Sequence, residues 1–293
     1  MSTEYRVSRR TLLIGAAVSG AGLCAKSLTA AEPAPSEKRK GRIRQSVRQW
    51  CFVHDGRLAL EDLYRHAVRI GYQAIDLIGP QDWPTVQKYG LACSSTPGPG
   101  SPTEGFNRKE NHASQVAQMK RIIDLAANAG VPNVSCYSGV RNGLPDDEGI
   151  RNCVEGIKQV AGHAEQKKVN ICMEYLNSKI DHKDYQFDHI DFGLAVARQV
   201  GSPRFGILYD IYHAQIMDGD IIRTIREHHE YFLHYHTAGN PGRNDIDETQ
   251  ELYYPAIMRA IAETGYKGFV AQEFTPKGDP VRALERAYEI CDV

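Results

Sequence analysis

Carboxylate and imidazole side chains end several apolar runs in the second half of the chain. They are Glu174 in ICMEY, Asp210 in FGILYD, His234 and His236 in YFLHYHT, and Glu273 in GFVAQEF. Carboxylates that lie close together repel one another and raise each other's pKa unless a positive charge lies between them. None of these runs contains Lys or Arg. We therefore expect a divalent cation held by carboxylate oxygens and one or two imidazole nitrogens.

The donor types favour some ions over others. Glu, Asp and His ligands without a thiolate suit Mn²⁺ or Mg²⁺ best, and Co²⁺ and Zn²⁺ are also compatible. Each residue taken alone has a simpler interpretation. Glu273 would pair with a loop cation, Asp210 would cap the helix that follows it, and one of the two histidines would only support a ligand or pack. The coincidence on four runs favours the metal site.

Short apolar strands alternate with amphipathic helices from about residue 45 onward. The predicted strands are 46–52, 74–79, 91–96, 133–139, 169–175, 205–210, 231–237 and 268–274. The predicted helices are 58–70, 82–89, 111–129, 146–167, 185–200, 218–229, 249–264 and 279–291. In 111–129, apolar residues recur three and four positions apart, and Gly130 and Pro132 end the helix.

The alternation predicts an α/β fold, a (β/α)₈ TIM barrel in one domain over residues 45–293. Such a barrel takes about 250 residues. A doubly wound open sheet is the alternative, but no G-x-G-x-x-G loop follows the first predicted strand. Because the active site of a TIM barrel lies at the carboxyl ends of its strands, the polar residues above would meet at one mouth.

The sequence resembles the hydroxypyruvate isomerase family of the xylose isomerase-like barrel superfamily, which also contains ketose 3-epimerases and endonuclease IV-type nucleases. The resemblance runs from roughly residue 45 to the carboxyl terminus. Its most specific motifs are MEYLNSK, LYDIYHAQIMDGD, HYHTAGNPGR and AQEF. It implies one divalent metal bound by Glu174, Asp210, His236 and Glu273.

The same resemblance implies substrate contacts. The His of its D-x-x-H motif corresponds to His213 and the Arg of its P-G-R motif to Arg243, and both are expected to contact substrate oxygens. Further candidates for substrate contact are Asn177, His112 and His234. The family's ketose 3-epimerases carry a glutamate six residues after the first metal-binding glutamate, where this chain has Ile180.

These residues suit an aldose–ketose type of isomerisation through an enediolate, such as hydroxypyruvate to tartronate semialdehyde. Glu174 and Glu273 would be the catalytic acid and base, and a metal would stabilise the enediolate. Arg243 would pair with a substrate carboxylate, which favours a small acid over a neutral sugar. The alternatives are a ketose 3-epimerase, another sugar-modifying enzyme of the superfamily, or a barrel that binds a sugar acid without turnover.

The amino terminus has the composition of an export signal. Arg9 and Arg10 precede a short apolar stretch over residues 11–25, and the small residues 29–31 follow it, an order that is typical of the twin-arginine route. We expect a signal peptide over 1–31, a polar linker over 32–44 and a periplasmic location. The apolar stretch is too short for a comfortable membrane span, so the mature form is expected to have none.

Composition excludes some partners. The chain has 35 Lys and Arg against 36 Asp and Glu, and such a balance lacks the basic field that nucleic-acid binding requires. The expected partner is a small hydroxycarbonyl compound or sugar, and the barrel type suggests a homo-oligomer. The seven cysteines show no C-x-x-C spacing, which predicts buried thiols rather than disulfides or a zinc–thiolate site.

Overall fold

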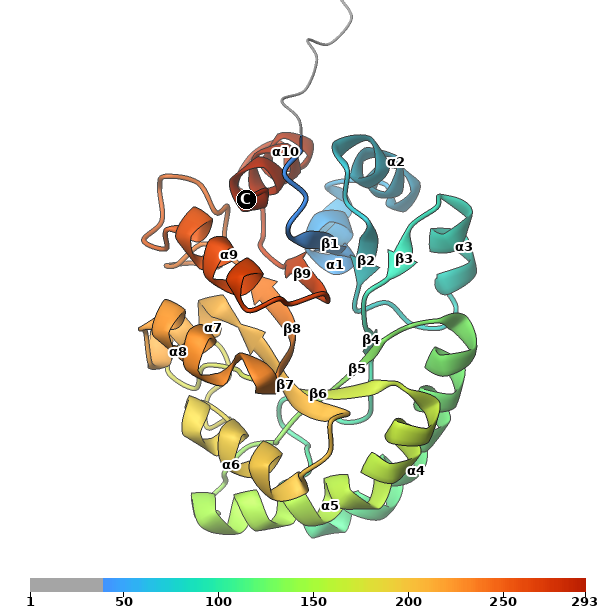
Figure 1. Cartoon of the computed structure of the whole chain (residues 1–293), viewed down its shortest axis with the longest axis vertical. Coiled ribbons are helices and arrows are strands. Elements are labelled where there is room, and N and C mark those ends of the chain that lie inside the picture. Colours follow the sequence, from blue (N-terminus) through green and yellow to red (C-terminus); the bar gives the residue numbers. More distant parts are fainter. Residues whose placement is uncertain (1–38) are drawn as a thin grey trace, which may run out of the picture. The chain divides into compact units, whose positions relative to one another are not determined.

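Short parallel strands curve into a nearly closed barrel in the computed structural model, which describes residues 39–293 (Figure 1). The strands are β1 Arg44–Arg48, β2 Ala74–Asp76, β3 Ala92–Cys93, β4 Thr96–Pro97, β5 Asn133–Cys136, β6 Asn170–Glu174, β7 Phe205–Asp210, β8 Phe232–Thr237 and β9 Phe269–Gln272. Their order in the sheet is β3-β2-β1-β9-β8-β7-β6-β5-β4. The predicted TIM barrel is confirmed.

The helices alternate with the strands and surround them (Figure 1). They are α1 Gln49–Val53, α2 Leu60–Ile70, α3 Trp83–Lys88, α4 Lys109–Ala129, α5 Asp146–Lys167, α6 Ile190–Val200, α7 Ile211–Met217, α8 Ile221–His228, α9 Tyr254–Glu263 and α10 Pro280–Cys291, with 3₁₀ turns at His54–Gly56 and His229–Tyr231. Capping residues in the sequence explain where some of these helices begin or end. Gly71 ends α2 with a left-handed φ of 116°, and the Asp279 carboxylate caps α10 by accepting from the amides of Val281 and Arg282.

Two predicted strands differ from those observed. The run 46–52 leaves the sheet after Arg48 and turns into α1, whose Cys51 and Phe52 are buried. An apolar run does not by itself distinguish a strand from a short buried helix. The run 91–96 is split, because β3 pairs with β2 whereas β4 pairs with β5. One stretch of chain therefore supplies both ends of the sheet.

The region before α6 also differs from the prediction. The predicted helix 185–200 begins only at Ile190, and residues 177–189 form a long loop after β6. A helix that was not predicted, α7, follows β7 directly.

Burial explains why the strands are apolar. Every residue of β7 is buried, because helices cover the outside of a parallel barrel.

Part of the predicted organisation lies outside the described residues. The signal peptide over 1–31 and most of the linker fall within residues 1–38. At the end of the linker, the amides of Lys40 and Gly41 donate to the Asp292 carboxylate, and β1 begins at Arg44. Within residues 39–293, no helix combines the length and apolar character needed to cross a bilayer.

The loop 177–189 is fastened to the barrel mouth by Arg141, which follows β5. Its guanidinium donates to both carboxylate oxygens of Asp188, at 2.6 and 3.0 Å, and to the Tyr185 carbonyl at 2.6 Å. Asp188 is 4% exposed, so it depends on this partner. The contact matters for function, because the same loop contains Asn177 and His182 beside the site described below.

We expect Arg141→Met to lower the free energy of unfolding by about 2 kcal/mol, because Asp188 then stays buried without its cation. Urea unfolding followed by circular dichroism measures the change. Arg151→Met is the matched control, since Arg151 pairs with Asp147 at the exposed surface and should leave the midpoint unchanged. Equal midpoints for the two variants would contradict the role of Arg141.

The six cysteines within residues 39–293 are all buried and free, which confirms the prediction of buried thiols for them. Cys24 lies outside the described residues. Burial raises the pKa of Cys51, Cys93 and Cys291 to about 12, so their thiols stay protonated at neutral pH.

Native protein should therefore react with a thiol reagent such as dithiobisnitrobenzoate at these six positions only after unfolding, because neither access nor thiolate is available in the fold. Mass spectrometry of the labelled protein, with and without urea, assigns the sites. Labelling of any of the six at a rate near that of a free thiol would contradict the described burial.

Candidate active site

Three strands and the residue after a fourth bring acidic and imidazole groups to one point. A ligand atom from each of Glu174, Asp210, His236 and Glu273 lies within 4.8 Å of the others, and all four side chains are buried. His236 Nδ1 is 3.5 Å from Glu174 Oε1 and 3.9 Å from Asp210 Oδ2, and it contacts Glu273 Oε2. We call these four residues the central cluster.

Strand register explains the convergence. Asp210 at the end of β7 is opposite His236 of β8, and Thr237 of β8 is opposite Gln272, which places Glu273 one step beyond β9. Glu174 is the last residue of β6, the neighbour of β7 on its other side. Because the strands are parallel, their carboxyl ends deliver these side chains to the same mouth.

Asp210 caps a helix with one carboxylate oxygen and faces the central cluster with the other. Its Oδ1 accepts from the amides of Tyr212 and His213 at 2.9 and 3.3 Å and so caps α7. Its Oδ2 faces the central cluster. Burial raises the pKa of Asp210 to about 7, with Arg243 opposing the shift and Glu273 adding to it.

Two arginines also reach the central cluster, and sequence reasoning found only one of them. Glu273 Oε1 is 3.3 Å from Arg48 Nε, and Glu273 Oε2 is 3.1 Å from Arg243 Nη2. Arg243 Nη2 is also 3.6 Å from Asp210. These arginines lie outside the four apolar runs, so part of the positive charge at the carboxylates comes from the chain itself. Arg48 was missed because the predicted strand 46–52 ran past it, although it is the last residue of β1.

These charges shift the titration of the central cluster. Burial alone would raise the pKa of Glu273, but His236, Arg243 and Arg48 lower it well below its ordinary value. Burial alone would lower the pKa of His236, but Glu273 and Asp76 raise it well above its ordinary value. A cation that binds His236 Nδ1 must therefore displace a proton.

Two atoms of the central cluster fit a metal site. His236 Nδ1 and Glu273 Oε2 are buried and in ionic contact, and Oε2 is also 3.1 Å from Arg243 Nη2, yet neither atom makes a well-aligned hydrogen bond within residues 39–293. Buried polar atoms without a partner are rare and call for an explanation such as a bound ion. Three carboxylates and one imidazole, without a thiolate, match Mn²⁺ or Mg²⁺ and also accommodate Zn²⁺ or Co²⁺.

His213 lies beside the central cluster and is oriented by Asn177. Its Nδ1 accepts from the backbone amide of Asn177 at 3.2 Å and from the Asn177 side-chain amide at 2.6 Å. The neutral ring must therefore carry its proton on Nε2, which is 3.6 Å from Asp210 Oδ2 and has no hydrogen-bond partner in the described part of the chain. Burial lowers the pKa of His213 well below its ordinary value, so the ring is a neutral donor.

Two predicted substrate contacts, His234 and His112, are not part of the central cluster. His234 is fully buried, and its Nε2 bonds to Asp76 at 2.8 Å behind the central cluster. His112 Nε2 bonds to the carbonyl of Phe106 at 2.9 Å, and its ring lies close to Gly156 of α5. Neither ring is among the ligand groups of the central cluster. The register of α4 turns His112 toward α5, which the sequence pattern did not reveal.

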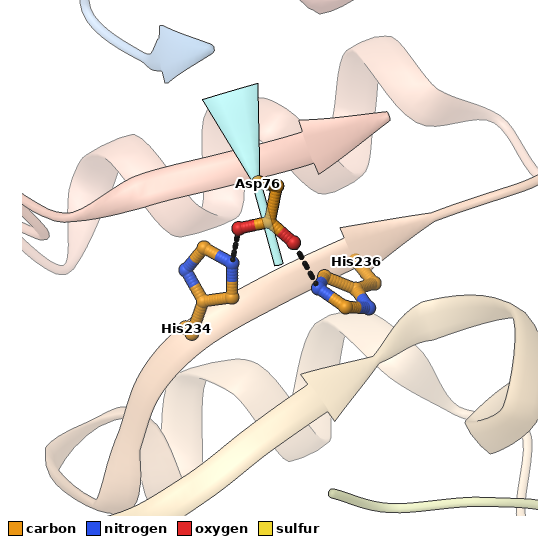
Figure 2. A group of neighbouring side chains, drawn as sticks. All are labelled: Asp76, His234 and His236. Atoms are coloured by element: carbon orange, nitrogen blue, oxygen red, sulfur yellow. Dashed lines mark hydrogen bonds and ion pairs between the residues drawn. The ribbon is translucent and has the colours of Figure 1, made fainter. Parts of the chain in front are cut away.

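Asp76 is the second residue that sequence reasoning missed. It ends β2 and lies between His234 and His236, with one oxygen bonded to each Nε2 (Figure 2). Burial alone would raise the pKa of Asp76, but the two histidines lower it well below its ordinary value. The sequence signal for Asp76 was the same as for Asp210, a carboxylate inside an apolar run. Because the predicted strand 74–79 continued beyond Asp76, this carboxylate was not recognised as the end of a strand.

A cavity of about 440 Å³ lies between the loop after β6, helix α7 and the loop after β8. Its walls include Ile180, Asp181, Ile216 and Pro241, together with Tyr212. Gly242, which precedes Arg243, also lines the cavity, and the guanidinium carbon of Arg243 is 5.7 Å from the centre of the Tyr212 ring. Such a volume is at the small end of ligand pockets.

Residues 64–290 match the family described as xylose isomerase-like TIM barrel. The chain belongs to this family. A human protein provisionally named hydroxypyruvate isomerase is 34% identical over 131 residues, which are 45% of this chain and 47% of the human protein. That match spans about half the length of the relative. The 2-oxo-tetronate isomerase of Haemophilus influenzae is 26% identical, over 76% of this chain and 91% of that protein.

Solved structures share the fold. A family 2 AP endonuclease from Brucella melitensis superposes with a TM-score of 0.72 at 22% identity, covering 83% of this chain and 97% of that one. The IOLI protein, solved with a bound zinc atom, superposes with a TM-score of 0.63 at 14% identity, covering 85% and 95%. At these identities the likeness concerns the fold alone.

Replacing a residue of the central cluster should weaken metal binding. We expect His236→Gln and Asp210→Asn each to lower the affinity for Mn²⁺ at least about 10-fold, because each removes or neutralises one donor. Asp210→Asn keeps an oxygen for the α7 cap. Calorimetric titration of metal-free protein measures the affinity. His112→Gln is the control, and an equal loss in that variant would contradict the assignment of ligands.

Proposed function

We propose that the protein is a metal-dependent isomerase that moves a proton between adjacent carbons of a small α-hydroxycarbonyl acid. The observation that carries the proposal is the meeting of two glutamates, a neutral histidine donor and two arginines at one buried point. The relatives named as isomerases of hydroxypyruvate and 2-oxo-tetronate support the same reaction class. Both names describe short oxo acids with a neighbouring hydroxyl group.

The central cluster holds the metal in this proposal. Glu174, Asp210, His236 and Glu273 would bind Mn²⁺ or Mg²⁺, with Co²⁺ or Zn²⁺ as substitutes. When bound, the cation supplies Lewis-acid polarisation of the substrate oxygens. The zinc in the IOLI structure supports metal binding in this fold family.

The two glutamates have unequal surroundings, which suggests unequal roles. Both oxygens of Glu273 contact guanidinium groups, Arg48 on one side and Arg243 on the other. Glu174 has one ionic contact within residues 39–293, at 3.5 Å from His236 Nδ1. Glu174 is therefore the better base for the first proton transfer. Once substrate has displaced its contact with Arg243, Glu273 takes up a proton from solvent and donates it to the neighbouring carbon, while Glu174 releases the proton it removed to solvent.

Arg243 and His213 position the substrate. The Arg243 guanidinium is 28% exposed, and it can pair with a carboxylate in bidentate fashion. Its backbone has a left-handed φ of 55°, which is uncommon for a side chain of this size and typical of functional loops. His213 donates from Nε2 to the substrate oxygen that gains negative charge. The cavity beside Arg243 accepts the rest of the molecule.

Incubation with Mn²⁺ or Mg²⁺ in deuterated water tests the reaction class. Hydroxypyruvate or a four-carbon oxo acid should exchange its carbon-bound hydrogen with solvent and give an isomer that nuclear magnetic resonance identifies. Glu174→Gln should lower kcat at least about 100-fold, since general bases contribute about 10²–10⁴-fold. A stereochemical inversion at C3 of a neutral ketose, without turnover of acids, would instead support an epimerase. Binding without exchange would exclude catalysis on these compounds.

Arg243→Met tests the preference for an acid. The variant should raise KM for the acidic substrate at least about 10-fold more than for a neutral ketose, because a paired carboxylate loses its partner. Any loss of kcat through Glu273 should affect both substrates alike. Arg223→Met, at an exposed pair with Asp220, is the control. An equal rise in KM for both substrates would contradict the pairing.

A further inference from the structure

Asp76 has more hydrogen-bond partners than its position on the short strand β2 requires. Its Oδ1 accepts from Ser94 Oγ at 2.6 Å, from Ser95 Oγ at 2.8 Å and from His234 Nε2 at 2.8 Å. Its Oδ2 accepts from His236 Nε2 at 3.0 Å. All five side chains are fully buried or nearly so. Asp76 thus contacts the central cluster through His236, but it has no part in the reaction above.

These contacts fix which nitrogen of His236 is free. An ionised carboxylate accepts hydrogen bonds and donates none, so the Nε2 that faces Asp76 must carry a proton. In the neutral ring, the form that binds a cation, the lone pair is then on Nδ1, which faces Glu174 and Glu273. Figure 2 shows the geometry, with Asp76 between the two rings and one dashed bond to each.

We propose that Asp76 is a positioning residue that holds His236 in the Nε2–H form and thereby directs Nδ1 to the cation of the central cluster. The proposal rests on the metal site of the proposed function. It does not depend on which reaction the site performs. Carboxylates that orient metal-binding histidines raise metal affinity by about 10- to 100-fold.

The same three residues permit another arrangement, in which a second cation lies between Asp76, His234 and His236. Their ligand atoms also lie within 4.8 Å of one another. The observed distances argue against it, because 2.8 and 3.0 Å are direct hydrogen bonds that a cation would have to break. His236 would also have to bind two metals through its two nitrogens. Metal stoichiometry separates the two arrangements.

The first experiment measures Zn²⁺ affinity by competition with a chromophoric chelator. Asp76→Asn replaces one acceptor oxygen with an NH₂ donor, so one of the two histidines loses its partner or must reverse its protonated nitrogen. We expect affinity to fall about 10- to 100-fold, with unchanged circular dichroism. Ser95→Ala is the matched control. It removes one donor to Asp76 and leaves the bond to His236, so its affinity should stay within about 3-fold of the wild type.

The second experiment needs no variant at Asp76, so it tests the proposed protonation of His236 even if Asp76→Asn does not fold. Nitrogen-15 spectra of zinc-loaded wild type, with His236 assigned by comparison with His236→Gln, should show a proton on Nε2 and none on Nδ1. A proton on Nδ1, or zinc bound through Nε2, would overturn the proposal. So would two zinc ions per chain, equal losses in Asp76→Asn and Ser95→Ala, or no zinc binding by the wild type. Failure of the isomerase assay alone would leave these zinc measurements unaffected.

Discussion

The central constraint of this structure is the electrostatic repulsion of three carboxylates around one imidazole nitrogen in a buried site. Glu174, Asp210 and Glu273 all face His236 Nδ1, and burial weakens the screening that water would provide. The fold places them there because four neighbouring parallel strands end at the same mouth. Such a site is stable only with compensating positive charge, and most of the surrounding contacts can be understood as supplying it.

Compensation comes from two sources in the chain itself. Arg48 and Arg243 contact opposite oxygens of Glu273, and together with His236 they favour its ionised form as long as these contacts are made. Within residues 39–293 neither arginine forms an ion pair with Glu174, which in the proposed reaction leaves Glu174 available to exchange a proton. The proposed function therefore assigns different roles to the two glutamates. It would also favour acidic substrates, because a substrate carboxylate could take the place of Glu273 as a partner of Arg243 while Glu273 keeps Arg48.

Asp76 and Asn177 orient the histidine rings at the barrel mouth. Asp76 holds two histidine rings from one strand, but only His236 reaches the carboxylates. Depth along β8 makes the difference, because His236 is opposite Asp210 whereas His234 is opposite Leu208, two residues further into the barrel. On the other side, Asn177 orients His213 by donating to its Nδ1. His236 and His213 thus each present one defined nitrogen to the mouth, Nδ1 of His236 and Nε2 of His213.

The sequence predicted the barrel and the gathering of Glu174, Asp210, His236 and Glu273, because a polar residue that ends an apolar run is visible without a structure. It could not reveal Arg48 or Asp76. Strands end where pairing with neighbours ends, and buried residues such as Leu77 continue the apolar run after β2 with a left-handed φ of 47°.

The two histidines of β8 could not be told apart for a related reason. Alternation places both on one face of the strand, and only register against β7 shows which of them is level with Asp210. The helix register that turns His112 away is equally a property of packing.

Anomalous diffraction from crystals soaked in Mn²⁺ tests the central claim most directly. The account predicts one peak per chain at about 2.0–2.2 Å from His236 Nδ1 and from an oxygen of each of the three carboxylates. A peak between Asp76 and His234, or no peak at the mouth under saturating Mn²⁺, would contradict it.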